Sequence, residues 1–253
     1  MSKTVVVTGG GRGIGRAIAL AFASQGAHVV ITSRTQSQLD ATASEIKARG
    51  ADATAIAMDV TDEASVAHGF GSLHGKVKHV DVLVNNAGIG GGEVVQGSDV
   101  ARWKRTLDTN LFGMYLVTRQ VLPLMANDGR IVNLSSVLGR FGVPGYTAYC
   151  ATKHGVIGFT RALSLELLKR KITVNAIAPG WVDTDMALQG WTQGATHAKV
   201  SVDEFKSMML DDVPIKRVID PTEVAALVKF LCSSEASAIT GQTYNICGGQ
   251  VMS

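Results

Sequence analysis

Short apolar runs alternate with amphipathic segments along almost the whole chain. The apolar runs are rich in β-branched residues and lie at 4–8, 28–33, 53–58, 80–85, 129–135, 172–178 and 242–246. Helix-length segments lie between them, near 14–26, 36–49, 62–74, 99–122, 147–169 and 221–232. Nearly continuous apolar strands are typical of a parallel sheet that helices bury on both faces. The pattern therefore predicts an α/β fold with a doubly wound parallel sheet of about seven strands.

Capping signals mark two of the helix starts. Thr61 precedes the acidic pair Asp62-Glu63 and is the expected N-cap of its helix. The run Asp220-Pro221-Thr222-Glu223 offers a cap, a proline at the first helical position and a capping-box glutamate. No linker or internal repeat interrupts the alternation, so we expect residues 1–253 to form a single domain.

One stretch departs from the alternation. Residues 181–213 mix two tryptophans and several methionines with glycines and polar residues. Large apolar side chains rarely stand in water without a function. We therefore expect a helical lid over the carboxyl ends of the strands, where open α/β sheets bind their ligands.

Composition and charge exclude several classes of protein. The net charge is +3 and no long basic run occurs, so nucleic acid is not an expected partner. The three cysteines lack a CxxC spacing and the six histidines lack a ligand spacing, so neither a disulfide framework nor a metal site is expected. The longest apolar run, 17–23, is too short to span a membrane, and no signal-peptide pattern precedes the first strand. We expect a cytoplasmic protein.

A glycine-rich loop follows the first strand. The sequence TGGGRGIG, residues 8–15, places Gly9, Gly13 and Gly15 between a strand and a helix. Such a unit turns backbone N–H groups and a helix N-terminus toward a pyrophosphate, as in Rossmann-type folds. The spacing matches neither G-x-G-x-x-G nor the P-loop, so the context of strand and helix carries the prediction.

The end of the second strand indicates which dinucleotide is bound. An NAD-specific fold commonly has a carboxylate there for the ribose 2′-hydroxyl. This chain has Ser33 and Arg34 instead, with Arg12 in the glycine loop. Two guanidinium groups without a carboxylate suit a 2′-phosphate, so we predict NADP(H).

Tyr146 and Tyr149 compete as the proton donor. Tyr149 and Lys153 are four residues apart and share a helix face, whereas Pro144 and Gly145 place Tyr146 at or before the first turn. A cation about 5 Å away at an effective dielectric near 20 favours phenolate by roughly 3 kcal/mol, or about 2.5 pKa units. We therefore expect Lys153 to bring the pKa of Tyr149 toward neutrality. Cys150 is interpreted as a packed thiol.

Six linked motifs give the chain a family resemblance. They are TGGGRGIG, NNAG at 85–88, Asn110 in LDTNLFG, Ser136 thirteen residues before Tyr149, YCATK, and PGWVDT at 179–184. In order and spacing the chain resembles the short-chain dehydrogenase/reductase family over essentially its whole length. The resemblance implies an enzyme that transfers a hydride between a nicotinamide and a ketone or secondary alcohol.

The resemblance also implies roles for single residues. Tyr149 would be the acid/base, Ser136 would bind the carbonyl oxygen, Lys153 would lower the pKa of Tyr149 and hold the ribose, and Asn110 would anchor a water. The implied cofactor-binding residues are Gly9, Arg12, Gly13, Ile14, Gly15, Ser33, Arg34, Asp59, Val60, Asn86, Ala87, Gly88, Tyr149, Lys153, Pro179, Gly180, Val182 and Thr184. The expected substrate pocket comprises Ser136, Leu138, Tyr146, Trp181 and Met186, while Ser135 is expected to be structural.

Finer features resemble particular members of that family. The segments NNAGIGGG, VPIKRVIDPTEVAALV and NICGG are similar to 3-oxoacyl-carrier-protein reductases and aromatic polyketide ketoreductases. We expect a 3-oxoacyl thioester or polyketide-like ketone, held on a carrier protein or on CoA. Ile89-Gly90 replaces the Arg-Pro of the polyketide enzymes, so shared stereochemistry does not follow. The alternatives are a hydroxyacyl-CoA, hydroxysteroid or cyclic-alcohol dehydrogenase and, more remotely, a non-catalytic nucleotide sensor.

Two helices are the expected contacts in a homotetramer. Segments 99–122 and 147–169 are broadly apolar, and family members resemble dimers and tetramers built on them. The residues expected on these surfaces are Trp103, Leu107, Leu111, Met114, Val117, Val121, Val156, Phe159, Leu163 and Leu167.

Overall fold

A single seven-stranded sheet organises the chain. The computed structural model describes residues 2–252 except 74 and 93. The strand order is β3-β2-β1-β4-β5-β6-β7, and every neighbouring pair is parallel. The predicted fold class is therefore confirmed. The strands are β1 (Thr4–Thr8), β2 (His28–Ser33), β3 (Ala53–Ala57), β4 (Val80–Asn85), β5 (Met125–Leu134), β6 (Thr173–Pro179) and β7 (Thr243–Ile246).

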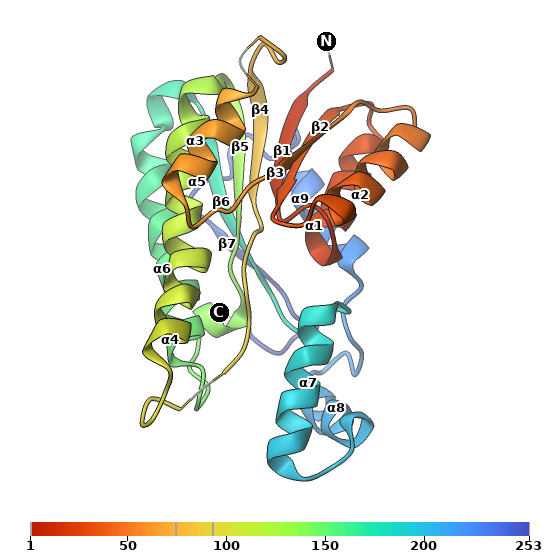
Figure 1. Ribbon diagram of the computed structural model, residues 1–253, viewed down its shortest axis with the longest axis vertical. Coiled ribbons are helices and arrows are strands. Elements are labelled where there is room, and N and C mark those ends of the chain that lie inside the picture. The colour runs from red at the N-terminus through yellow and green to blue at the C-terminus, as the bar shows by residue number, and fades with distance from the viewer. Residues whose placement is uncertain (1, 74, 93, 253) are drawn as a thin grey trace.

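Helices cover both faces of this sheet (Figure 1). One face carries α1 (Gly13–Ala23), α2 (Gln36–Ala48) and α9 (Pro221–Leu231). The other carries α3 (Glu63–Gly71), α5 (Gly113–Val121) and α6 (Thr147–Glu166), with α4 (Val100–Leu107) packed against α6. Successive strand side chains point to opposite faces, so Val5 and Val7 lie in the first core and Val6 lies in the second. This double burial explains why the strands are continuously apolar.

The predicted segment 99–122 is not one regular helix. It forms α4, then a π-helical turn at Asp108–Phe112, then α5. The local change of pitch puts Asn110 on the inner side of the turn, where it is 3% exposed. Such single turns occur frequently at functional sites.

Two details of the predicted elements are wrong. The N-cap of α3 is Asp62, whose carboxylate accepts from Ala64 N and Ser65 N. Thr61 instead donates to Asp59, because the turn after β3 places its hydroxyl there. β5 also begins at Met125 rather than 129, since Met125 pairs with Val80 across a register irregularity.

Most of the apolar residues that were expected to form subunit contacts on segments 99–122 and 147–169 are buried inside the protein. Six of the ten residues named for them are buried: Met114, Val117, Val121, Val156, Leu163 and Leu167. Val117, Val121, Leu163 and Leu167 belong to the core on the face of the sheet that carries α5 and α6. The exposed large apolar residues on these elements include Trp103, Phe112, Tyr115 and Leu165, and the Phe112 and Tyr115 rings stack 5.9 Å apart. The expected faces are wrong in detail because helical spacing alone does not show which stripe the sheet covers.

Two helices project from the body beyond the carboxyl ends of the strands (Figure 1). They are α7 (Asp185–Ala198) and α8 (Val202–Asp211), which lie within the segment expected to be a lid. The chain leaves and re-enters the body at one place, where Ile219 N donates to Trp181 O and Asp183 N donates to Ile219 O. The same two backbone hydrogen bonds therefore hold both ends of the segment that carries α7 and α8.

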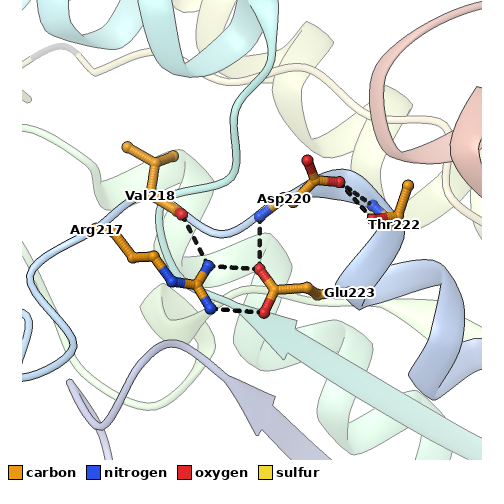
Figure 2. A network of polar contacts seen from close by, with 5 residues as sticks. All are labelled: Arg217, Val218, Asp220, Thr222 and Glu223. Atoms are coloured by element: carbon orange, nitrogen blue, oxygen red, sulfur yellow. Dashed lines mark hydrogen bonds and ion pairs between the residues drawn. The ribbon is translucent and has the colours of Figure 1, made fainter.

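A polar network follows that bridge (Figure 2). Arg217 donates to both carboxylate oxygens of Glu223, at 2.6 and 2.8 Å, and to Val218 O. Glu223 also accepts from Asp220 N, and the Asp220 carboxylate accepts from the backbone N–H of Glu223, so the expected capping box is present. Asp220 accepts from Thr222 as well. The network connects the end of the segment that carries α7 and α8 to the first turn of α9.

No helix in the described part of the chain is long and apolar enough to cross a bilayer.

Candidate functional site

The glycine loop brings backbone close to backbone where β1 turns into α1. A Cβ atom on Gly15 would lie 2.2 Å from Gly9 O, so only glycine fits there. Gly9 and Gly13 have φ of +66° and +54°, a conformation that glycine adopts without strain. No side chain caps α1 and its first turn has no acidic residue, so its N-terminal N–H groups are available to an anion.

Asn86 and Thr8 brace this loop against β4. Asn86 Nδ2 donates to Thr8 O at 2.9 Å and to Gly9 O at 3.3 Å. The Thr8 hydroxyl accepts from the backbone N–H groups of Asn86 and Ala87, each at 3.0 Å. The Asn86 side chain, expected beside a ribose, is therefore committed to the loop. β1 and β4 meet here at the point where the strand order reverses, which is the usual ligand position in such sheets.

A cleft of about 780 Å³ opens over the loop. Of the predicted cofactor residues, those that line it are Gly9, Arg12, Gly13, Ile14, Ser33, Arg34, Asp59, Val60, Asn86, Ala87, Gly88 and Thr184. The predicted residues outside its lining are Gly15, Tyr149, Lys153, Pro179, Gly180 and Val182. The first group comes from five separate stretches of the chain, and the fold brings these stretches to one edge.

The adenosine end of this cleft suits a phosphate. Arg34 is exposed at the end of β2, and Ser33 Oγ lies within 3.3 Å of Thr35 N and Thr35 O. Arg12 donates to Asp185 at 3.3 Å, and both side chains are well exposed, so this pair is weak and readily exchanged for an anion. The uncapped helix, the glycine cradle and the two cations fit a dinucleotide with a 2′-phosphate.

Asn110 is held to the loop at the end of β4. Asn110 Oδ1 accepts from Ile89 N at 2.8 Å, and Asn110 Nδ2 donates to Ile89 O at 2.9 Å. The same nitrogen lies 3.4 Å from the Thr152 hydroxyl on α6. Ile89 itself lines the cleft. Asn110 thus joins the cleft loop to the helix that carries Tyr149 and Lys153.

Ser136, Tyr149 and Lys153 converge between β5 and α6. Lys153 Nζ lies 5.5 Å from the centre of the Tyr149 ring and donates to Leu134 O at 2.8 Å. Ser136 follows the end of β5, and its hydroxyl hydrogen-bonds to Tyr149 and accepts from Leu138 N at 3.2 Å. Ser135, the neighbouring hydroxyl, donates to Lys153 O within the core. The helix spacing predicted the pairing of Tyr149 with Lys153, and the structure has it.

The prediction that Lys153 brings the pKa of Tyr149 toward neutrality is wrong. Burial raises its pKa to about 12, and the hydrogen bond from Ser136 only partly opposes this rise. Burial also lowers the pKa of Lys153 to about 8. Taking both groups out of water disfavours the phenolate and the ammonium alike, and this cost outweighs their attraction. The prediction from the sequence considered only the attraction between the lysine and the phenolate at a dielectric near 20, and it left out the cost of removing both groups from water.

The residues expected in the substrate pocket do not all gather around Tyr149. The Tyr146 ring lies against Gly92, where an added Cβ would be 2.8 Å from Cε2, and Met186 reaches across to Gly90. Trp181 packs on Trp191 of α7 with ring centres 5.6 Å apart. Leu138 follows Ser136 in a short 3₁₀ turn at Val137–Gly139. Tyr146 and Met186 therefore border the glycine-rich loop, while Trp181 packs against α7.

Sequence reasoning missed three groups that position these residues. They are the Thr8 hydroxyl, the Thr152 hydroxyl and the Leu134 carbonyl oxygen. No motif spacing reveals a backbone carbonyl that accepts from a lysine. Thr8 and Thr152 stood within recognised motifs, but Asn86, which donates to Thr8, lies 78 residues away in the chain, and Asn110, which donates to Thr152, lies 42 residues away.

Comparison with known families gives one match over most of the chain. Residues 9–250 match a family model described as enoyl-(acyl carrier protein) reductase. Among curated relatives, the chain is 38% identical to the 3-oxoacyl-[acyl-carrier-protein] reductase FabG of Staphylococcus epidermidis over the full length of both proteins. It is 40% identical to the FabG protein of Aquifex aeolicus, over 98% of this chain and 96% of that one.

Solved structures agree with this match. A phenylalanine-to-tryptophan variant of actinorhodin polyketide ketoreductase with NADPH is 38% identical, with a TM-score of 0.95 over 98% of this chain and 97% of that chain. Levodione reductase is 32% identical, with a TM-score of 0.92 over the same shares. The similarity therefore extends over the glycine loop, the Tyr149 region and the projecting helices.

Proposed function

Because this chain belongs to the short-chain dehydrogenase/reductase family, we propose that it is an NADP(H)-dependent ketoreductase that interconverts a ketone and a secondary alcohol. The observation that carries the proposal is the hydrogen-bonded hydroxyl pair of Ser136 and Tyr149 beside Lys153. Two adjacent hydroxyl groups can both donate to an oxygen atom that gains charge during reaction. The relatives named as 3-oxoacyl reductases and as a ketoreductase support carbonyl chemistry.

The roles of the residues follow from their contacts. Tyr149, with a pKa of about 12, is fully protonated at pH 7 and gives its proton to the carbonyl oxygen. Ser136 donates a hydrogen bond to the same oxygen. Lys153, with a pKa of about 8, is mostly protonated at pH 7 and holds positive charge near the phenol as its proton leaves.

Asn110 continues the proton path. Its side-chain amide is engaged by Ile89, so a water would bind at the remaining lone pair of Oδ1 or at the Asn110 carbonyl. That water would lead from Lys153 toward solvent. The same amide fixes Ile89 at the wall of the cleft, so one residue both positions the loop and extends the proton relay.

The cleft residues fit NADP(H), which supplies the hydride when bound. The α1 N-terminus and Gly13 would hold the pyrophosphate, and Arg12 and Arg34 the 2′-phosphate. Asp59 and Val60 would flank the adenine, Ala87 and Gly88 the ribose, and Thr184 the carboxamide. Lys153 and Tyr149 would reach the nicotinamide ribose from α6. Gly15, Pro179, Gly180 and Val182 lie outside this lining.

A 3-oxoacyl thioester or a polyketide-like ketone is the substrate class that we propose, presented by a carrier protein or by CoA. The named activities of the FabG relatives and of the actinorhodin enzyme support it. The matching family model is described as an enoyl-(acyl carrier protein) reductase. That description also implies an acyl group on a carrier protein, but the bond reduced is a carbon–carbon double bond instead of a ketone. Levodione reductase supports the alternative of a cyclic ketone. The substrate would lie between Ser136, Tyr146 and Met186, under α7 and α8 acting as a lid.

We also propose a cytoplasmic homotetramer. The exposed Trp103, Phe112 and Tyr115 on α4, the π-turn and α5, together with Leu165 on α6, support contacts through this face. Light scattering at micromolar concentration tests the assembly, and a monomeric mass would refute it.

The first experiment follows NADPH and NADH oxidation with acetoacetyl-CoA and with a bicyclic ketone such as a decalone. Reduction of either ketone with NADPH supports the proposal, and the preferred ketone identifies the substrate class. A preference for NADH would contradict the assignment of Arg12 and Arg34. A protein that binds NADPH but reduces no ketone would favour a non-catalytic nucleotide sensor.

A further inference from the structure

A second cleft, of about 460 Å³, lies between α4 and α7 beyond the cofactor cleft. Arg102, Arg105, Thr106 and Thr109 form one wall, at the spacing of a single helix face. Met186, Gln189 and Gln193 form the opposite wall on one face of α7. Gly88, Ile89 and Gly90 form its floor, and α4 and α7 border the loop from two sides (Figure 1). We call this space the α4–α7 cleft.

The charge of the α4–α7 cleft has one sign. Arg12, Arg34, Arg102 and Arg105 line it, and none of the described residues in its lining is acidic. Arg12 pairs with Asp185, but no ion pair joins Arg34, Arg102 or Arg105 to a carboxylate in the described part of the chain. Arg102 is also partly buried, unlike Arg105 and Arg34. A partly desolvated guanidinium without a carboxylate gains most from an added anion.

Arg102 reaches Gly91, the residue that follows the floor of this cleft. Its Nη2 atom lies 2.8 Å from the position of a Cβ on Gly91, and Gln193 Oε1 lies 3.9 Å from the same point. A guanidinium donor and an amide side chain thus approach Gly91 from opposite walls. Gly92, the next residue, contacts the Tyr146 ring.

Arg102 and Tyr146 lie against two neighbouring glycines of one loop, Gly91 and Gly92, and Tyr146 precedes Tyr149 by three residues at the start of α6. The Arg102 guanidinium acts on the Tyr146 hydroxyl, where burial raises the pKa and the nearby cation opposes the rise. Tyr146 also adds slightly to the raised pKa of Tyr149, which is due mainly to burial. An elongated molecule with its ketone at Tyr149 would therefore extend past Tyr146 toward Arg102.

We propose that the α4–α7 cleft binds an oxyanion at the end of the substrate remote from its ketone, and that Arg102 is the residue that selects for it. This inference rests on the proposed ketoreductase function. The oxyanion is a phosphate or a carboxylate, since both match the planar donor fork of arginine. It would be a phosphate on the thiol carrier of a thioester or a carboxylate on the ketone itself.

Paired substrates test the charge. Acetoacetyl-CoA is compared with the N-acetylcysteamine thioester of acetoacetate, which lacks the phosphates, and 7-oxooctanoate is compared with its methyl ester. Arg102→Gln should raise KM about tenfold for the charged member of one pair and leave its neutral member unchanged. The pair that responds identifies phosphate or carboxylate. An equal change for charged and neutral members, or no change in any of the four, would overturn the proposal.

Lys104→Gln is the matched control. Lys104 stands on the same helix and carries the same charge, but it lies outside the cleft and pairs with Asp108 at 2.5 Å. It should leave all four KM values unchanged. The KM for NADPH should also stay constant in Arg102→Gln, which separates the role of Arg102 from the 2′-phosphate contacts proposed for Arg12 and Arg34.

A binding measurement removes the dependence on turnover. Inorganic pyrophosphate is titrated calorimetrically into the protein saturated with NADP⁺. Wild-type protein and Lys104→Gln should bind it, and Arg102→Gln should bind at least several-fold more weakly. Equal binding by all three proteins, or binding by none, would overturn the proposal even if the protein reduces no ketone.

Discussion

Lys153 Nζ lies 5.5 Å from the centre of the Tyr149 ring, with its proton directed to Leu134 O rather than to the phenol. The lysine therefore acts on Tyr149 through its charge and its position rather than through a direct hydrogen bond. Its contact with β5 also anchors α6 against the sheet. The distance between the two groups is thus determined by the packing of a helix on a strand.

Tyr149→Phe removes the proposed proton donor and keeps the ring. We expect kcat for ketone reduction to fall by about 10²- to 10⁴-fold, while the affinity for NADPH, measured by fluorescence titration, changes little. Tyr146→Phe, the neighbouring hydroxyl, should cost less than about tenfold. Reduction by Tyr149→Phe at a rate near that of the wild type would refute the assignment.

The buried Lys153 should make stability depend on pH. Its folded pKa of about 8 lies below its ordinary value of 10.5, so between these values the folded state binds fewer protons than the unfolded state. The unfolding free energy should therefore rise with pH across that window, by about 3 kcal/mol at most. Below pH 8 the lysine is charged in both states, and folding carries the full cost of burying it.

Urea unfolding of wild type and Lys153→Met at pH 7, 8, 9 and 10 isolates this contribution. The difference between the two proteins should shift in favour of wild type as pH increases. The window stops at pH 10 because Tyr149, with its raised pKa, has the opposite sign above that value. A difference that is constant from pH 7 to pH 10 would contradict a lowered lysine pKa.

Arg34→Gln should reduce discrimination between the two dinucleotides. Removal of one charge-assisted contact to a 2′-phosphate should raise KM for NADPH by about tenfold or more and leave KM for NADH unchanged. Lys47→Gln, an exposed cation on α2 outside the cleft, serves as the control. Equal changes with both cofactors would show that Arg34 does not contact the 2′-phosphate.

Asn110→Ala should damage both stability and turnover. The variant leaves Ile89 N and Ile89 O without their partner, which should lower the unfolding free energy by about 1–3 kcal/mol. Asn110→Asp separates the two bonds, because a carboxylate accepts from Ile89 N but cannot donate to Ile89 O. Thermal unfolding should rank the proteins as wild type above both variants. A wild-type melting temperature in Asn110→Ala would show that the two bonds to Ile89 contribute nothing.

The sequence by itself determined the sheet, the glycine loop and the pairing of Tyr149 with Lys153. These features depend on neighbours in the chain: strand burial on a period of two residues, a helix face on a spacing of four, and a loop between adjacent elements. For this reason the bounds of β1, β2 and β4 agree with the prediction.

Only the tertiary structure decided the features that depend on distant contacts. The pKa of Tyr149 depends on how much water α6 and β5 exclude. The two hydrogen bonds between Asn110 and Ile89 depend on a π-turn that no pattern of apolar residues predicts. The α4–α7 cleft joins four arginines from three stretches of the chain, from Arg12 to Arg105, so their common surface exists only in the fold. Desolvation and long-range proximity are properties of the packed molecule, and a sequence pattern contains neither.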